Sequence, residues 1–351
     1  MKKIFLFAAI AALFTFTSCN EKMDVPSTAE RVTVDVRIVS GSPMTKATGT
    51  VNTTTAEYQT TDEATVQNLQ VFIFNGDVRD GYASVNASEA TQISCTAGTR
   101  DIYAIVNAPS LGSVMTKTAL LATASYLLED ADKFEMVGSL SAQTVSSTAS
   151  ANDFTVPVNR IASKIVVKSI ENALANGGNF TVKRVFISNV AGENTYAGNA
   201  VPGASGTWYN PGGYFAANNL GTFTNDVNLS AAVANGSSYT TNHYFYAYPN
   251  NKEFAPYNPS GWAPKRTLLV VQIEYAGNLY DYPIDLGVDL ESNKMYVLNN
   301  LKLVNLGNQD DGDEGGEDEE DPITGTTVDV DVTVVDWTLV ILGNASGEIE
   351  I

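Results

Sequence analysis

The stretch Val32-Thr33-Val34-Asp35-Val36-Arg37-Ile38 alternates apolar and polar side chains with a period of two. Because successive side chains of a strand point to opposite faces, this pattern predicts a half-buried β-strand with Val32, Val34, Val36 and Ile38 on one face. Similar segments recur along the chain between clusters of Gly, Asn, Asp and Pro, at residues 69–74, 102–106, 154–158, 164–169, 181–187, 243–248, 267–275 and 295–303. We therefore predict a mostly β protein.

The number and spacing of these strands favour β-sandwiches. A length of 351 residues favours two domains, and we place the boundary at residues 159 and 160. One helix is predicted at 117–128, where Ala and Leu replace β-branched residues. The Gly-, Asn- and Pro-rich segments 191–219 and 250–264 are expected to be surface loops outside the core.

The first 18 residues are typical of a signal peptide. Two lysines precede an uncharged run at 4–16, which is too short to span a bilayer as a helix. Two small residues, Thr17 and Ser18, then precede Cys19, as at a lipoprotein processing site. We expect Cys19 to be acylated, with palmitate among the chains, and to hold the precursor to a membrane. The alternative is a plain secretory signal with an incidental cysteine.

Composition disfavours one class of partner and leaves the fold without an intramolecular disulfide. The chain has 39 acidic and 20 basic residues, a formal net charge of -19, which disfavours binding to nucleic acid. Only two cysteines are present, so if Cys19 carries lipid, Cys95 has no partner for an intramolecular disulfide.

The sharpest change in composition is QDDGDEGGEDEED at residues 309–321, where nine of 13 residues are acidic. Such a segment cannot bury itself, and we predict a self-repelling linker over 309–326. A calcium loop is the alternative, but the EF-hand pattern fails because Gly315 stands at a ligand position and Pro322 stands at the position of the bidentate Glu.

A second alternating strand follows the linker. Val328, Val330, Val332 and Val334 share one face, and the alternation then passes to the other face with Val335, Trp337 and Leu339, so we expect a bend near 334–335. The acidic tether is expected to free this strand from its own domain. It shares its pattern with the strand at 32–38, so the two could occupy one groove by turns.

The segment 40–49 lies between the first strand and the rest of the chain and is rich in small residues, as protease-sensitive loops are. A trypsin-like enzyme would cut it between Lys46 and Ala47.

Several segments, in this order, resemble the fimbrillins, the type V pilins of Bacteroidales. The resemblance spans nearly the whole chain and rests on the signal ending at Cys19, the strand at 32–38, and the segments 69–76 (LQVFIFNG), 97–108 (AGTRDIYAIVNA), 158–165 (VNRIASKI), 296–298 (YVL) and 328–340 with DWTLV at its end.

The resemblance implies two transthyretin-like β-sandwich domains, here 47–159 and 160–308, with one or two short helices and a C-terminal donor strand within 327–351. It also implies a lipidated precursor on the outer membrane whose propeptide, 19–46, is removed by a trypsin-like extracellular protease after Lys46. The major fimbrillin has arginine at this site, so lysine implies a broader or different basic specificity. Loss of the strand at 32–38 would open a groove for the donor strand of an identical subunit, giving a head-to-tail fibre with minor tip and anchor pilins.

The remaining function classes are weaker. No cofactor or metal motif is present, and the single histidine, His243, lies in an alternating aromatic strand where a structural role is expected, so we predict no enzyme activity. A carbohydrate-binding surface lipoprotein is the main alternative, because loop aromatics could stack on sugars: Trp208, Tyr209, Tyr214, Phe215, Tyr257 and Trp262. The favoured interpretation is that these aromatics pack the loops onto the sandwich. A tip or anchor pilin is a further alternative to a shaft subunit.

Overall fold

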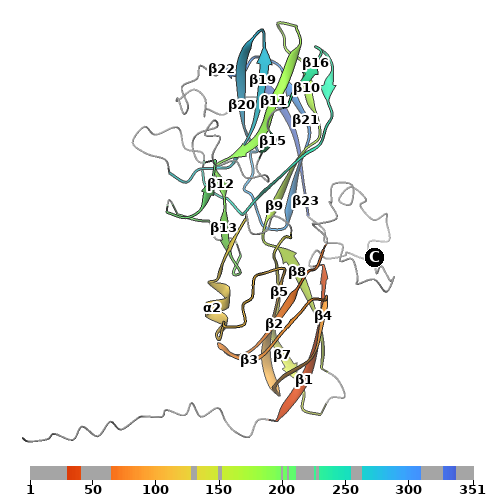
Figure 1. The fold of residues 1–351 in the computed structure, drawn as a ribbon, viewed down its shortest axis with the longest axis vertical. Coiled ribbons are helices and arrows are strands. Elements are labelled where there is room, and N and C mark those ends of the chain that lie inside the picture. The colour runs from red at the N-terminus through yellow and green to blue at the C-terminus, as the bar shows by residue number, and fades with distance from the viewer. Residues whose placement is uncertain are drawn as a thin grey trace, which may run out of the picture.

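A computed structural model gives the fold of the protein. It describes residues 30–40, 65–127, 133–148, 152–198, 201–203, 205–210, 225–226, 229–253, 263–309 and 327–336. Figure 1 shows an elongated molecule, with the sheet that contains β1 in the lower half and the sheets that contain β11 and β21 in the upper half.

The lower half is built on one seven-stranded sheet with the order β3-β2-β5-β7-β8-β1-β4. Its strands are β1 (Arg31–Ser40), β2 (Leu69–Asn75), β3 (Val78–Val85), β4 (Glu89–Thr96), β5 (Gly98–Val106), β7 (Met136–Val145) and β8 (Asp153–Arg160). The sheet curves so that β4 approaches β3, and the Thr96 amide donates a hydrogen bond to the Asp80 carboxylate at 2.7 Å. A closed apolar core results, with side chains from β1, β2, β4, β5, β7 and β8.

The predicted helix at 117–128 is shorter than expected. Helix α2 (Lys117–Leu121) has five residues. Thr116 is its N-cap, and the Thr116 side chain accepts a hydrogen bond from the Ala119 backbone amide. The chain then forms β6 (Ala124–Tyr126), which pairs with β13 (Glu193–Thr195). Pairing with a segment about 70 residues away outweighed the local helix preference of the Ala- and Leu-rich sequence.

The upper half contains two six-stranded sheets. One runs β17-β10-β21-β9-β18, and β23 pairs with β21; its strands are β9 (Ser163–Val167), β10 (Ile170–Asn172), β17 (Ser238–Tyr239), β18 (His243–Ala247), β21 (Lys294–Leu303) and β23 (Val328–Asp336). The other runs β15-β11-β19-β20-β22, with β16 paired to β11; its strands are β11 (Phe180–Ser188), β15 (Asn225–Asp226), β16 (Ala231–Val233), β19 (Leu268–Tyr275), β20 (Asn278–Asp285) and β22 (Asn308–Gln309). A short ladder joins β12 (Val190–Ala191) to β14 (Trp208–Tyr209).

The two halves share one apolar core. Phe72 and Phe74 of β2 belong to the same buried cluster as the inner side chains of the upper sheets. At the junction the rings of Phe134 and Tyr246 lie 4.6 Å apart, and Ser125 forms a hydrogen bond with Tyr248. A continuous core of this kind holds the halves together by burial of apolar surface.

The mostly β architecture with several sheets is confirmed, and each strand predicted from periodicity is present. The expectation for the segment 191–219 is wrong in its described part. Ala191, Tyr196 and Trp208 are buried in the main core, since the β12–β14 ladder folds this segment onto the upper sheets.

Candidate assembly site at strand β1

Strand β1 lies between two partners that come later in the sequence. It runs antiparallel to β4, with Val32 opposite Cys95 and Val34 opposite Ile93, and parallel to β8, with Ile38 opposite Val156. Both edges of β1 are therefore hydrogen-bonded, and its removal would leave two rows of backbone groups facing an open slot.

The apolar face of β1 completes the core of the lower half. Val34 and Val36 are fully buried and Ile38 is 5% exposed, and all three belong to one cluster with side chains of β4 and β8. Val32 is half-buried and packs against the same cluster. The face predicted from the sequence is thus the face that the fold buries.

A β-bulge in β4 shapes the middle of the slot. The pairing shifts between Val34 and Val36, so that Asp35 alone faces Thr91 and Gln92. Gln92 has a φ of 57°, and its backbone amide donates a hydrogen bond of 2.6 Å to Oδ1 of Asp35. An aspartate on β1 thereby satisfies an amide that the bulge takes out of the ladder.

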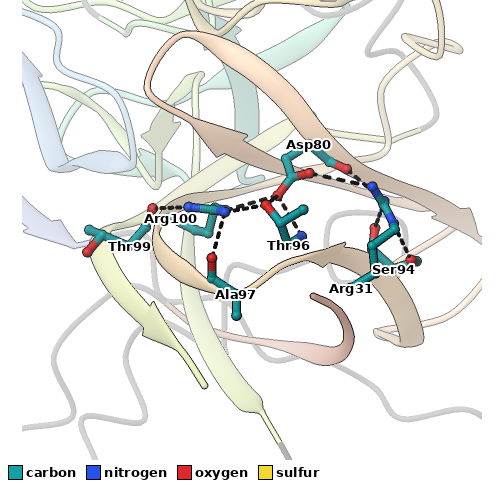
Figure 2. A network of polar contacts seen from close by, with 7 residues as sticks. All are labelled: Arg31, Asp80, Ser94, Thr96, Ala97, Thr99 and Arg100. Carbon is teal, nitrogen blue, oxygen red and sulfur yellow. Dashed lines mark hydrogen bonds and ion pairs between the residues drawn. The ribbon is translucent and has the colours of Figure 1, made fainter. Parts of the chain in front are cut away.

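Arg31, at the start of β1, joins a polar network that links β1, β3, β4 and β5 (Figure 2). Its guanidinium donates to Oγ and to the backbone carbonyl of Ser94, each at 3.0 Å, and lies 3.8 Å from Oδ1 of Asp80. The other carboxylate oxygen of Asp80 accepts hydrogen bonds from the Thr96 hydroxyl at 2.6 Å and from Nε of Arg100 at 2.9 Å. Arg100 also donates to Thr96 Oγ1 and to the Ala97 and Thr99 carbonyls.

Asp80 is the centre of this network. Burial opposes ionisation of its carboxyl group, but hydrogen bonds from the hydroxyl and amide of Thr96 and from Arg100 outweigh burial and lower its pKa. Asp80 therefore stays charged at neutral pH and neutralises Arg100, whose side chain is 5% exposed. Arg31 adds a weaker contact, because its side chain is 55% exposed.

Cys95 lies in the wall of the slot, directly opposite Val32. It is buried and carries a free thiol. Burial, and secondarily the negative charge of Asp80, raises the pKa of this thiol to about 11. The thiol is thus protonated at neutral pH and unreactive while β1 is in place.

Strand β23 is docked on its own upper half. It pairs antiparallel with β21 from Leu303↔Val328 to Lys294↔Asp336. Val328 is buried, and Val330 packs partly buried on the same core. The acidic tether therefore does not keep the strand apart from its domain, and the predicted donor residues Val328, Val330, Val332 and Val334 lie in this ladder.

Other predicted site residues lie outside the described part of the chain: Cys19, Lys46, Ala47, Trp337 and Leu339, and the loop aromatics Tyr214, Phe215, Tyr257 and Trp262. Trp208 is buried in β14 and donates from Nε1 to the Gly203 carbonyl, so it packs the loop onto the core and offers no platform for a sugar. His243 is buried in β18 beside the rings of Tyr239 and Phe245, which confirms its structural environment.

The sequence predicts no role for Asp80, Gln92 or Arg100. Arg100 lies in the segment 97–108 on which the resemblance rests, but no local pattern links it to Asp80 on another strand. Among the described residues, no group of three or more His, Cys, Asp or Glu side chains is placed to hold a metal ion. In the same part of the chain, no helix has the length and apolar character needed to cross a membrane.

The sequence from residue 32 to residue 253 matches the family model of the major fimbrial subunit protein FimA. The chain belongs to the FimA family of major fimbrial subunit proteins. This match begins within β1 and extends over β4 and β8, and the family is one of fimbrial structural subunits and not a family of enzymes. A FimA-family subunit is a component of a surface fimbria, and other pilus subunits are its expected partners.

Solved structures support the fimbrillin fold over most of the chain. A candidate cell adhesion protein from Bacteroides eggerthii is 19% identical, with a TM-score of 0.59 over 89% of this chain and 97% of that protein. The fimbrilin FimA from Porphyromonas gingivalis W83 is 16% identical, with a TM-score of 0.57 over 88% and 98%. The tip fimbrial protein Mfa3 from Porphyromonas gingivalis is 13% identical, with a TM-score of 0.51 over 88% and 100%. No curated protein gives a significant sequence match.

Proposed function

We propose that this fimbrial subunit forms the shaft of a surface fimbria and polymerises when a protease releases β1 and a strand of the next subunit replaces it. The observation that carries the proposal is the position of β1. A strand at the very start of the described chain fills a two-sided slot in a core built otherwise from residues 65 to 160. Subunits joined through such a slot meet head to tail and need not close into a ring, so a fibre results.

Apolar burial and backbone hydrogen bonding in the slot stabilise β1 and would stabilise a replacement strand in the same way. Burial of Val34, Val36 and Ile38 contributes roughly 1.5–3 kcal/mol for each side chain before the entropy cost. Two ladders of backbone hydrogen bonds add to this, as in other recognition by strand addition. Since one strand replaces another of similar pattern, cleavage is what makes the exchange one-way.

The donor is the C-terminal segment that contains β23. On β21 this strand occupies a sheet edge with one hydrogen-bonded neighbour, whereas the slot offers two. Transfer to the slot would also place Val330, which is half-buried in its own domain, at a fully buried position, while Val328 would move from a buried to a half-buried one, so the second hydrogen-bonded neighbour is the main gain. Docking on β21 would thus shield the donor until a slot opens.

The proposed maturation begins with a precursor held to the outer membrane through lipid on Cys19. A trypsin-like protease then cuts between Lys46 and Ala47. Arg31 and Arg37 are poorer cleavage sites, because both lie in β1 with backbone paired to β4, and a protease needs an extended, accessible backbone. The released fragment carries both the lipid and β1, which frees the subunit.

Limited trypsin digestion of the soluble precursor, with Cys19→Ser to prevent lipidation, tests this proposal. We expect cleavage after Lys46, release of a fragment containing β1, and SDS-resistant ladders that electron microscopy shows as fibres. A Lys46→Gln precursor is the matched control and should remain monomeric under the same digestion. Complete cleavage after Lys46 with no ladder at any concentration would refute polymerisation by strand exchange.

Two shortened chains locate the donor. A chain that ends after Asp321 lacks β23 and should accept a donor at its slot but add no further subunit. A chain that ends after Asp336 keeps β23 and separates the contribution of Val328–Asp336 from that of Trp337 and Leu339. Normal fibres from the chain that ends after Asp321 would refute the donor assignment.

The presence of both a releasable β1 and a C-terminal strand favours a shaft role. A tip subunit needs a slot but no donor, and an anchor would keep its own β1. Shaft subunits should therefore appear along the whole length of a fibre in immunogold labelling, with labelling at one end only as the contrary result.

A further inference from the structure

We propose that the carboxylate of Asp331 from the incoming subunit replaces that of Asp35 as the hydrogen-bond acceptor of the Gln92 backbone amide. This contact would fix the register of the exchanged strand. This inference rests on the strand exchange proposed above and names the contact that aligns it. In the resulting register Val328, Val330, Val332 and Val334 take the positions of Val32, Val34, Val36 and Ile38.

The slot contains a backbone amide, that of Gln92, that needs a hydrogen-bond acceptor from the strand at the position of Asp35. The bulge in β4 places two residues opposite Asp35, and the Gln92 amide is directed to the Asp35 side chain at 2.6 Å and not to the backbone of β1. When β1 leaves, this amide loses its acceptor. A new strand that carries a carboxylate between two inward-facing apolar residues would satisfy the amide and the core at once.

The C-terminal strand meets this demand when it is aligned residue by residue with β1. The segments 32–38 (VTVDVRI) and 328–334 (VDVDVTV) both have aspartate at the fourth position and β-branched apolar residues at the first, third, fifth and seventh. Valine at the two fully buried positions, those of Val34 and Val36, keeps the volume of the core unchanged.

A shift by two residues would place Asp329 on Gln92. Asp331 would then take the position of Arg37, directly opposite Glu89 of β4. Two acids facing each other across a ladder destabilise the pairing. In the proposed register a neutral residue, Thr333, faces Glu89.

A shift in the other direction would place Asp336 on Gln92. Trp337 would then take the position of Val36, which is fully buried between Ala90 of β4 and Phe154 of β8. An indole does not fit a site made for a valine without displacing the core. All three registers that bring an aspartate to Gln92 also place it opposite Asp153 of β8, where Asp35 lies in the precursor. Among them, only the proposed register adds neither a second opposed acid nor an overfilled position.

The exchange loses the contacts of Arg31, since Thr327 stands at its position and residues 303–351 contain no Lys or Arg. This loss is small. Arg31 is largely exposed, and Asp80 keeps its hydrogen bonds to Thr96 and Arg100 in the same network (Figure 2). The register therefore depends on Asp331 and the valine face, not on the ion pair.

Cys95 provides a register probe in the natural slot. It lies opposite position 32, and directly opposed residues of an antiparallel pair are within the range that a disulfide can bridge. Full-length chains carrying Val328→Cys, Thr326→Cys or Thr333→Cys place a thiol opposite Cys95 in the registers set by Asp331, Asp329 and Asp336 respectively. Each chain is cleaved after Lys46, which removes the residue at position 19, and assembled with copper phenanthroline present while the slot is open.

We expect covalent multimers on a non-reducing gel from Val328→Cys alone. A Cys19→Ser precursor that carries Val32→Cys is the positive control: it is refolded with copper phenanthroline present, so that β1 docks while Cys95 is still accessible, and should form an intramolecular disulfide with Cys95, found by peptide mapping. Multimers from Thr326→Cys or Thr333→Cys instead would overturn the register. So would fibres in which none of the three chains is cross-linked while the control is. If the wild-type chain forms no fibres, the strand exchange itself fails, which is a separate result.

The contact of Asp331 is tested by Asp331→Ala against Asp329→Ala, two variants that remove the same charge from the same strand. We expect assembly of Asp331→Ala to be about three- to tenfold slower and that of Asp329→Ala to be close to wild type. Equal assembly rates for the two variants would show that a hydrogen bond from the Gln92 backbone amide to Asp331 does not align the incoming strand.

Discussion

Replacement of Val36 by alanine should weaken the precursor and leave the finished fibre unchanged. Val36 is fully buried between β4 and β8, so Val36→Ala removes two methyl groups from a closed core. The lost transfer free energy is about 1.6 kcal/mol, and the cavity left behind raises the cost to roughly 2–3 kcal/mol. After cleavage β1 has left, and the substitution leaves with it.

Urea unfolding of the Cys19→Ser precursor, followed by tryptophan fluorescence, measures the first effect. With a denaturant slope of roughly 1–3 kcal/mol per molar urea, the midpoint should fall by about 1 M. Val39→Ala is the matched control, because Val39 lies on the outer face of β1 and is 39% exposed, and its free energy of unfolding should change by less than about 0.5 kcal/mol.

SDS resistance of the fibres measures the second effect. Fibres grown from Val36→Ala precursor should dissociate at the same temperature as wild-type fibres. If they dissociate earlier, β1 is still present in the fibre, and replacement of β1 by a donor is wrong. An unchanged urea midpoint of the precursor would contradict the burial argument itself.

Three further outcomes follow from the lower half. Gly138→Ala should prevent stable folding or cost several kcal/mol, because a Cβ at this position would lie 2.1 Å from the backbone oxygen of Pro157; thermal melts can compare it with Gly203→Ala, which meets open space. Acid should destabilise the lower half, because the pKa of Asp80 is lowered below 3.8 in the folded protein. The contribution of Asp80 to stability is therefore present above pH 3.8 and is lost as the pH falls through the folded-state pKa. Urea midpoints measured from pH 2 to pH 7 would show this loss. Asp80→Asn should leave Arg100 without its carboxylate and lower the free energy of unfolding at pH 7 by about 2–4 kcal/mol. Its midpoint should fall less at low pH than that of the wild type, with the remaining fall due to groups such as Asp77 and Asp101, whose pKa values are also lowered; an equal fall in the variant would contradict a role of Asp80.

Local sequence predicted the strands with clear alternation or apolar runs, but it missed β3, β4, β7 and β20. The period-two pattern at β1 predicted both its position and its buried face, since alternation on a half-buried strand is a local property. The segments 69–74, 102–106 and 267–275 predicted the positions of β2, β5 and β19, of which β2 and β19 are buried on both faces. The helix at 117–128 was predicted too long because local propensity carries no information about the distant strand β13, which pairs with residues 124–126. Packing of Trp208 onto the fold was the favoured interpretation, but its ladder with β12 and its burial in the main core depend on how the segment folds back, which no local pattern predicts.

The fold class, the apolar face of β1, the resemblance to fimbrillins and the similarity between the strands at 32–38 and 328–334 all follow from the order of residues along the chain. Tertiary structure alone decided that β1 lies between β4 and β8, that Asp80 pairs with Arg100, that Gln92 needs the Asp35 carboxylate, and that β23 docks on β21. The physical reason is that alternation specifies which way a side chain points, whereas the neighbours of a strand are set by long-range packing and by irregularities such as the β4 bulge, which appear only when distant segments meet.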